Sequence, residues 1–203
     1  AEMQAVEREA NAAGLSYEMM MENAGTSLAE LIQEEYGYLQ ESGILGLVGS
    51  GNNGGDTLVA LAWLQKRGWR TTAYIVRERA ADDPLILRLS EAGGSILTLA
   101  EDKKLKKLAK LLEENEILLD GVLGTGMRLP LKEELASLLG FVRRKIIEMA
   151  EPPCVIAVDC PSGVDCDSGE AAEECLPAEM TITMAAVKQG LFKFPANDLA
   201  GEL

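Results

Sequence analysis

Short apolar runs of strand length alternate along the chain with longer segments whose apolar residues recur every three or four positions. The apolar runs are predicted to be strands, and they occupy residues 44–48, 71–76, 95–99, 117–119, 154–158 and 180–184. Strands that are separated by amphipathic helices favour a parallel sheet with helices on both faces. We therefore expect an α/β protein of the doubly wound class.

The predicted helices have recognisable ends. Two helices open the chain on either side of Gly14, and both are expected to pack on the sheet. A later helix has Asp83 as its N-cap and Pro84 at its first helical position, where proline is favoured. Pro130 is predicted to begin another helix. The lysine-rich segment 102–113 is interpreted as a solvated helix face, because no aromatic residues are interleaved with its lysines.

Composition limits both the fold and the chemistry. The length of 203 residues suits one domain spanning residues 1–203, and 47% apolar with 26% charged residues is a globular balance. The net charge of −14 opposes a general grip on nucleic acid, which we do not expect as a partner. Because the chain has no histidine, proton transfer must rest on Asp, Glu, Lys, Tyr, Cys or water. No apolar run approaches the roughly 20 residues of a membrane span, so no membrane association is expected.

The cysteines do not indicate a metal or redox site. All four lie in the last third of the chain, and none forms the C-x-x-C pair typical of zinc or redox chemistry. They are Cys154, Cys160, Cys166 and Cys175. We expect reduced thiols without a catalytic role, in a cytoplasmic protein.

Candidate chemistry gathers where predicted strands end, because ligands of open parallel sheets bind beyond the carboxyl ends of the strands. The first strand is followed by a glycine-rich turn, residues 49–56, that runs directly into a helix. Such a turn could be purely structural. However, Asn52, Asn53 and Asp56 add hydrogen-bonding groups that a plain turn does not need, and exposed amides at a helix start can hold an anion.

Two further strand ends carry aspartates. Asp120 ends one apolar run, and Asp159 ends the next and is followed closely by Ser162. Either aspartate alone could cap a turn, but two buried carboxylates in one crevice favour a shared proton or a bound cation. The oxygen ligands point to an alkali or alkaline-earth ion rather than zinc. Lys188 follows the last strand and is interpreted as a surface lysine, or else as a phosphate contact.

These motifs resemble those of the YjeF N-terminal domain family, the NAD(P)HX epimerases. The matching segments are residues 20–25, 51–56, 120–126, 158–163 and 181–183, the last leading to Lys188, in family order over nearly the whole chain. The resemblance implies a Rossmann-like three-layer αβα sandwich with a mostly parallel central sheet. It also implies an isomerase that interconverts the R and S epimers of hydrated NADH and NADPH in nicotinamide nucleotide repair.

The site residues that the resemblance implies fall on the strand ends. Asp159 would lie on the reacting ring as catalytic acid or base. Asn53, Asp120 and Ser162 would help to hold a potassium ion, K+. The residues implied to contact the hydrated dinucleotide are Asn52, Asn53, Gly54, Gly55, Asp56, Gly124, Thr125, Gly126, Met127, Arg128, Leu129, Pro130, Asp159 and Lys188.

The resemblance further implies a homodimer, and a fused or separate ADP- or ATP-dependent NAD(P)HX dehydratase as partner. Two other classes of function stay open. The same fold also serves as a non-catalytic binding or scaffold module, which should have lost the acids at positions 120 and 159. A conventional NAD-dependent dehydrogenase is disfavoured, because G-x-G-x-x-G is missing and the second strand runs into Arg77 rather than an acid.

Overall fold

The predicted parallel sheet is present in the computed structural model, which describes residues 2–80 and 82–203. The sheet has six strands in the order β3-β2-β1-β4-β5-β6, and every neighbouring pair is parallel. The strands are β1 (Ile44–Val48), β2 (Thr71–Ile75), β3 (Ser95–Thr98), β4 (Ile117–Gly121), β5 (Cys154–Val158) and β6 (Met180–Ile182). The chain reverses its direction of travel across the sheet between β1 and β4, and ligands of open α/β sheets bind at such a switch point.

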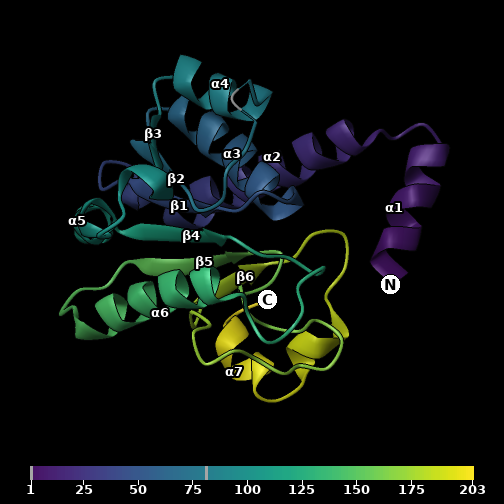
Figure 1. The fold of residues 1–203 in the computed structure, drawn as a ribbon. Helices are drawn as coiled ribbons and strands as arrows, with labels where there is room; N and C mark the ends of the chain where they lie inside the picture. Colours follow the sequence, from purple (N-terminus) through teal and green to yellow (C-terminus); the bar gives the residue numbers. More distant parts are fainter. Residues whose placement is uncertain (1, 81) are drawn as a thin grey trace.

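Helices cover both faces of the sheet, so the molecule has three layers (Figure 1). The helices are α1 (Glu2–Ala12), α2 (Tyr17–Tyr36), α3 (Asn52–Gln65), α4 (Pro84–Glu91), α5 (Lys106–Glu114), α6 (Glu133–Glu148) and α7 (Ala196–Ala200). Short 3-10 turns lie at Gly37–Leu39, Leu99–Glu101 and Gln189–Phe192. One buried core joins α2, α3 and α4 to the sheet, and a second joins α5 and α6 to its other face. The expected αβα sandwich is therefore confirmed.

The first helix does not pack on the sheet as expected. α1 stands clear of the body of the molecule in Figure 1, and its Val6 is 54% exposed. Val6 and Ala10 provide too little apolar surface to hold a helix this polar against a core. α2 does pack closely, because Gly25 has no side chain to separate it from α3: a Cβ there would lie 2.5 Å from Val59 Cβ.

Several predicted element boundaries shift, and three of these shifts have a clear local reason. The helix expected from Pro130 begins at Glu133, behind a loop whose Leu131 still packs on the second core. The lysine-rich helix begins at Lys106, because the Asp102 carboxylate accepts backbone N–H groups at its first turn. The last strand ends at Ile182 rather than 184, because the backbone N–H of Met184 donates to the Asp159 side chain instead of a strand.

Within residues 2–80 and 82–203, no helix combines the length and the apolar character needed to cross a bilayer.

The end of β4 is packed tightly against α3. A Cβ at Gly121 would lie 1.9 Å from Thr57 Oγ1, which itself donates a hydrogen bond of 2.7 Å to the Asn53 carbonyl. We expect Gly121→Ala to lower the free energy of unfolding by about 1–3 kcal/mol, the usual cost of overpacking a core. Denaturant unfolding measures this change, and adding Thr57→Ala should recover part of it.

Gly126→Ala is the matched control, since no atom lies within 4 Å of a Cβ at that position. Its unfolding midpoint should stay close to that of the wild type. An equal loss in both variants would contradict the packing argument.

Candidate active site

The predicted site lies at the carboxyl ends of β1, β4 and β5, which are neighbours in the sheet. The register pairs Val48 with Gly121 and Asp120 with Ala157, so the three strands end at nearly the same level. The glycine-rich turn after β1 ends there and α3 begins at Asn52. Residues far apart in the sequence are thereby brought to one edge of the sheet.

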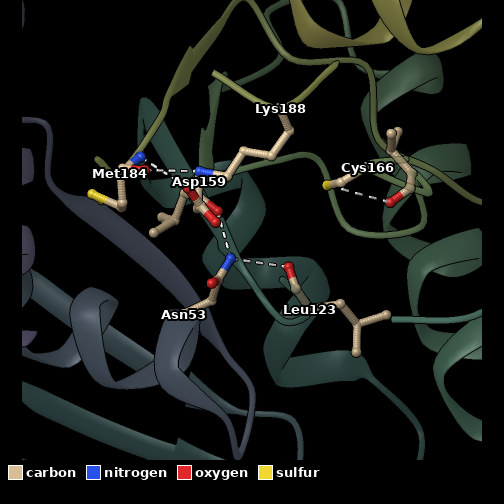
Figure 2. A network of polar contacts seen from close by, with 8 residues as sticks. Asn53, Leu123, Asp159, Cys166, Met184 and Lys188 are labelled. Atoms are coloured by element: carbon tan, nitrogen blue, oxygen red, sulfur yellow. Dashed lines mark hydrogen bonds and ion pairs between the residues drawn. The ribbon is translucent and has the colours of Figure 1, made fainter. Parts of the chain in front are cut away.

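Asn53, at the start of α3, bonds to the ends of β4 and β5. Its side-chain Nδ2 donates to the Val158 carbonyl at 2.6 Å and to the Leu123 carbonyl at 3.1 Å (Figure 2). Gly124 makes room for this contact, because a Cβ there would lie 2.3 Å from Asn53 Oδ1. The expectation that Asn53 has a role beyond the turn is consistent with these bonds, which cross from α3 to the ends of β4 and β5.

Asp120 is completely buried and bonds to Ser162. The Ser162 hydroxyl donates to Asp120 Oδ1 at 2.5 Å, and the Ser162 backbone N–H donates to Oδ2 at 2.8 Å. The same hydroxyl oxygen accepts the Leu123 backbone N–H at 2.9 Å, which ties the loops after β4 and β5 together. Burial raises the pKa of the Asp120 carboxyl above its usual value, although the bonds from Ser162 act in the opposite sense.

Asp159 forms an ion pair with Lys188. The Lys188 ammonium donates to Asp159 Oδ1 and, at 2.9 Å, to the Met184 carbonyl, while the Met184 N–H donates to the same Oδ1 at 2.8 Å (Figure 2). Both charged residues are only 7% exposed. The interpretation of Lys188 as a surface lysine is therefore wrong, and its ammonium serves the carboxylate at the end of β5.

The negative charge of Asp159 affects the pKa of a second carboxylate, that of Asp56. Asp56 lies in the first turns of α3 and is 6% exposed. Burial, followed by the negative charges of Asp159 and Glu7, raises the pKa of Asp56 to about 7, against a lowering by Lys188. The site thus holds an acid whose pKa is raised into the neutral range, together with a carboxylate that is ion-paired to a lysine.

The two strand-end aspartates take separate partners. Asp120 bonds to Ser162 while Asp159 bonds to Lys188, although both lie on the edge that Asn53 bridges. The sequence pattern predicted that Asp120 and Asp159 would repel one another. In the structure the carboxylate that is affected by the charge of Asp159 is Asp56, whose pKa it raises. Nothing in the sequence alone signals this, because the effect depends on how deeply Asp56 is buried.

The other predicted contact residues divide into two groups. Asn52, Thr125, Gly126, Arg128 and Pro130 are exposed at the rim, with Met127 and Leu129 half-buried between them. Gly54 and Gly55 face the protein: a Cβ would lie 2.1 Å from the Gly49 carbonyl oxygen and 2.5 Å from Met21 Sδ, respectively. Close packing therefore explains these two glycines without a ligand.

The residues expected to hold a cation supply oxygen atoms. Asn53 Oδ1 and the Asp120 carboxylate lie on the same strand-end edge, with the Ser162 hydroxyl bonded to Asp120. Among the described residues, no group of three or more His, Cys, Asp or Glu side chains could hold a metal ion. One buried carboxylate with neutral oxygens fits a singly charged hard ion better than zinc.

A parallel sheet of this strand order, with a glycine-rich turn leading into α3, defines a Rossmann-like α/β protein whose site is built from strand-end acids. The chain belongs to the family described as YjeF-related protein N-terminus, which matches residues 17–190. The family expected from the motifs is confirmed.

Relatives with curated names agree with this assignment. The chain is 31% identical to an NAD(P)H-hydrate epimerase of Cenarchaeum symbiosum, over 100% of the chain and 90% of that protein. It is 34% identical to an NAD(P)H-hydrate epimerase of Clavibacter sepedonicus, over 100% and 86%. It also matches the bifunctional NAD(P)H-hydrate repair enzyme Nnr of Thermofilum pendens at 31% identity, but spans only 35% of that longer protein.

A solved structure shares the fold. The crystal structure of the yeast protein YNL200c superposes with a TM-score of 0.77 at 18% identity, covering 96% of this chain and 84% of the yeast chain. At this identity the likeness supports the fold alone.

The raised pKa of Asp56 makes stability depend on pH. The stabilisation from its protonated form is complete below the ordinary carboxyl pKa of 3.8 and is lost as the pH rises to about 7. Asp56→Asn mimics the protonated form, so its advantage over the wild type should widen by about 2–3 kcal/mol between pH 5 and pH 8, at about 1.4 kcal/mol per pKa unit. Denaturant unfolding at several pH values measures this gap.

Asp165→Asn is the control. Backbone N–H groups of Ser168 and Asp167 lower the pKa of Asp165, so that variant should lose stability relative to the wild type as the pH rises through the acid range. Parallel curves for Asp56→Asn and wild type would contradict the shift assigned to Asp56.

Proposed function

We propose that this chain, as a single domain over residues 1–203, is an NAD(P)H-hydrate epimerase that interconverts the R and S forms of hydrated NADH and NADPH. The observation that carries the proposal is the buried Asp159–Lys188 ion pair beside Asp56, whose pKa is about 7. This arrangement provides proton transfer near neutral pH in a chain without histidine. Membership of the family and the names of its relatives support the same activity.

Asp159 is the proposed catalytic base or acid at C6, the ring carbon that bears the hydroxyl. Both of its bonds, from Lys188 and from the Met184 N–H, fall on Oδ1, which leaves Oδ2 for the substrate. Asp159 has a left-handed backbone conformation, with φ of 67°, at the residue that follows β5. Asp56, whose pKa is about 7, is suited to exchange the complementary proton.

The residues of the rim would hold the dinucleotide around this centre. Of the expected contact segments 52–56 and 124–130, Asn52 and residues 125–130 reach the rim, and backbone N–H groups at the start of α3 suit a phosphate. Lys188 has a positioning role in this scheme, because its ammonium is bonded to Asp159 and the Met184 carbonyl rather than free for a phosphate.

A potassium ion belongs to the proposal. Asn53, Asp120 and Ser162 would hold it, and the ion would supply the positive charge that buried Asp120 lacks. Asp120 and Ser162 join the loops after β4 and β5, so the ion would steady both loops.

The proposal extends to the partners and the compartment. A homodimer would cover some of the exposed apolar residues of the first two helices, Val6, Tyr17 and Met19. An ADP- or ATP-dependent NAD(P)HX dehydratase is the proposed partner activity, fused or separate, in keeping with the bifunctional name of longer relatives. The four cysteines are free, as suits the reducing cytoplasm.

The function is tested by Asp159→Asn. NMR exchange between separated R and S epimers should slow by about 100-fold or more, the usual contribution of a positioned acid or base. The unfolding midpoint should fall, because the amide oxygen still accepts from Lys188 and Met184 but no longer balances the charge of the buried ammonium. Exchange is therefore compared under conditions in which circular dichroism shows that both proteins are folded. Exposed Asp198→Asn is the control with wild-type exchange. Unchanged exchange in Asp159→Asn would defeat the assignment, and nucleotide binding without exchange in the wild type would favour a binding module.

The ion is tested by thermal unfolding. Potassium should raise the Tm of the wild type, since a ligand at 100 times its Kd stabilises by about 2.7 kcal/mol. Sodium at equal ionic strength should raise it less, and Asp120→Asn should remove the difference. Equal Tm values in both salts would overturn the potassium site.

A further inference from the structure

A large cavity lies on the side of the glycine-rich turn away from Asp159. It has a volume of about 1290 Å³ and opens at the carboxyl ends of β2 and β3, with Ser50 of the turn on its wall. Its apolar lining includes Ile75, Val76, Ile96, Leu99 and Leu138. Apolar clefts of this kind suit a flat ring such as a purine. None of the residues that carry the proposed chemistry lines this cavity.

The cavity is basic in an acidic molecule. Four cationic residues line it against two acidic ones, Glu78 and Glu134, whereas the whole chain has a net charge of −14. The cations are Arg77, Arg79, Lys103 and Lys132. Lys103 comes from the lysine-rich segment, so that segment is not only a solvated helix face. This local excess of positive charge favours an anion against the field of the protein.

The two arginines have different states. Arg79 is engaged, since its Nε pairs with Asp83 at 2.7 Å and its Nη1 donates to the Gly49 carbonyl at 2.8 Å. Arg77 is half-buried, and its Nε is buried without a hydrogen-bond partner among the described residues. A buried donor without a partner is costly, and a bound acceptor would remove that cost. Arg77 forms no hydrogen bond or ion pair among the described residues, so of the two arginines it is the one available to a ligand.

The position of Arg77 in the fold indicates which part of a dinucleotide it would meet. The Val76 N–H donates to the Val48 carbonyl at 2.9 Å, so Arg77 is the first residue beyond the β2 ladder. In Rossmann-like sheets a side chain at this point meets the adenosine ribose: an acid binds a free 2′-hydroxyl, and an arginine accommodates a 2′-phosphate. The planar guanidinium forms paired bonds with phosphate oxygens.

We propose that this cavity binds the adenosine half of the substrate and that Arg77 contacts its 2′-phosphate, so that hydrated NADPH is preferred to hydrated NADH. The proposal rests on the proposed function for the identity of the substrate. The dinucleotide would cross the glycine-rich turn, with its nicotinamide at Asp159 and its adenosine over β2 and β3. Glu78 is exposed and follows Arg77 in the chain. If Glu78 rather than Arg77 contacted the ribose, the free 2′-hydroxyl of hydrated NADH would be favoured.

Calorimetric binding of two probes tests the subsite without any turnover. 2′-Phospho-ADP-ribose should bind the wild type about 10-fold or more tighter than ADP-ribose, as one charge-assisted contact to phosphate provides. Arg77→Gln should remove this preference with little effect on ADP-ribose, and Glu78→Gln should keep it. Arg144→Gln, an exposed arginine outside the cavity lining, is the control. Equal affinity for the two probes in the wild type would overturn the proposal.

Measurements of epimer exchange distinguish a failure of the proposed function from a failure of the adenosine subsite. If both hold, Arg77→Gln raises KM for hydrated NADPH about 10-fold, leaves KM for hydrated NADH within about 2-fold, and keeps kcat, because the contact is remote from the reacting ring. Probe preference without exchange of either substrate would refute the proposed function and leave the subsite standing. Exchange of both substrates with equal KM and no probe preference would refute the subsite and leave the function standing.

Discussion

The hydrogen bonds from the Asn53 side chain are the constraint on which the site depends. One amide at the start of α3 donates to the loop after β4 and to the last residue of β5, so a single residue fixes three segments that are distant in the sequence. The parallel register makes this possible, because it ends β1, β4 and β5 at nearly the same level. Tight glycine contacts at Gly121 and Gly124 then leave little freedom for α3 to move relative to the strand ends.

Electrostatics divides the strand-end edge into parts with different tasks. Asp120 is buried with neutral partners and lacks a positive neighbour, which suits a cation. Asp159 is paired with the positive charge of Lys188, and burial beside that carboxylate raises the pKa of Asp56 to about 7. Burial and neighbouring groups thus give three carboxylates of the same chemical type three different electrostatic environments. Across the glycine-rich turn, the cavity around Arg77 adds a positive region that the net charge of the chain does not suggest.

Sequence reasoning predicted the architecture well because its signals are local. Strand-length apolar runs, the Asp83 cap and the proline after it appear in the structure where the pattern placed them. The errors occurred where tertiary context decides. α1 has helical periodicity but too little apolar surface to dock, and Lys188 has the composition of a surface residue although the fold buries it on Asp159. The raised pKa of Asp56 depends on burial, which no sequence pattern records.

The backbone at position 159 narrows the choice of residue before any chemistry is considered. A φ of 67° lies in the left-handed region, which glycine, asparagine and aspartate tolerate and which β-branched residues avoid. Of those three, aspartate alone brings a negative charge to Lys188. A related chain that kept this backbone conformation without the reaction could therefore replace the aspartate with few residues, chiefly glycine or asparagine. Either replacement would leave the buried ammonium of Lys188 without a counterion.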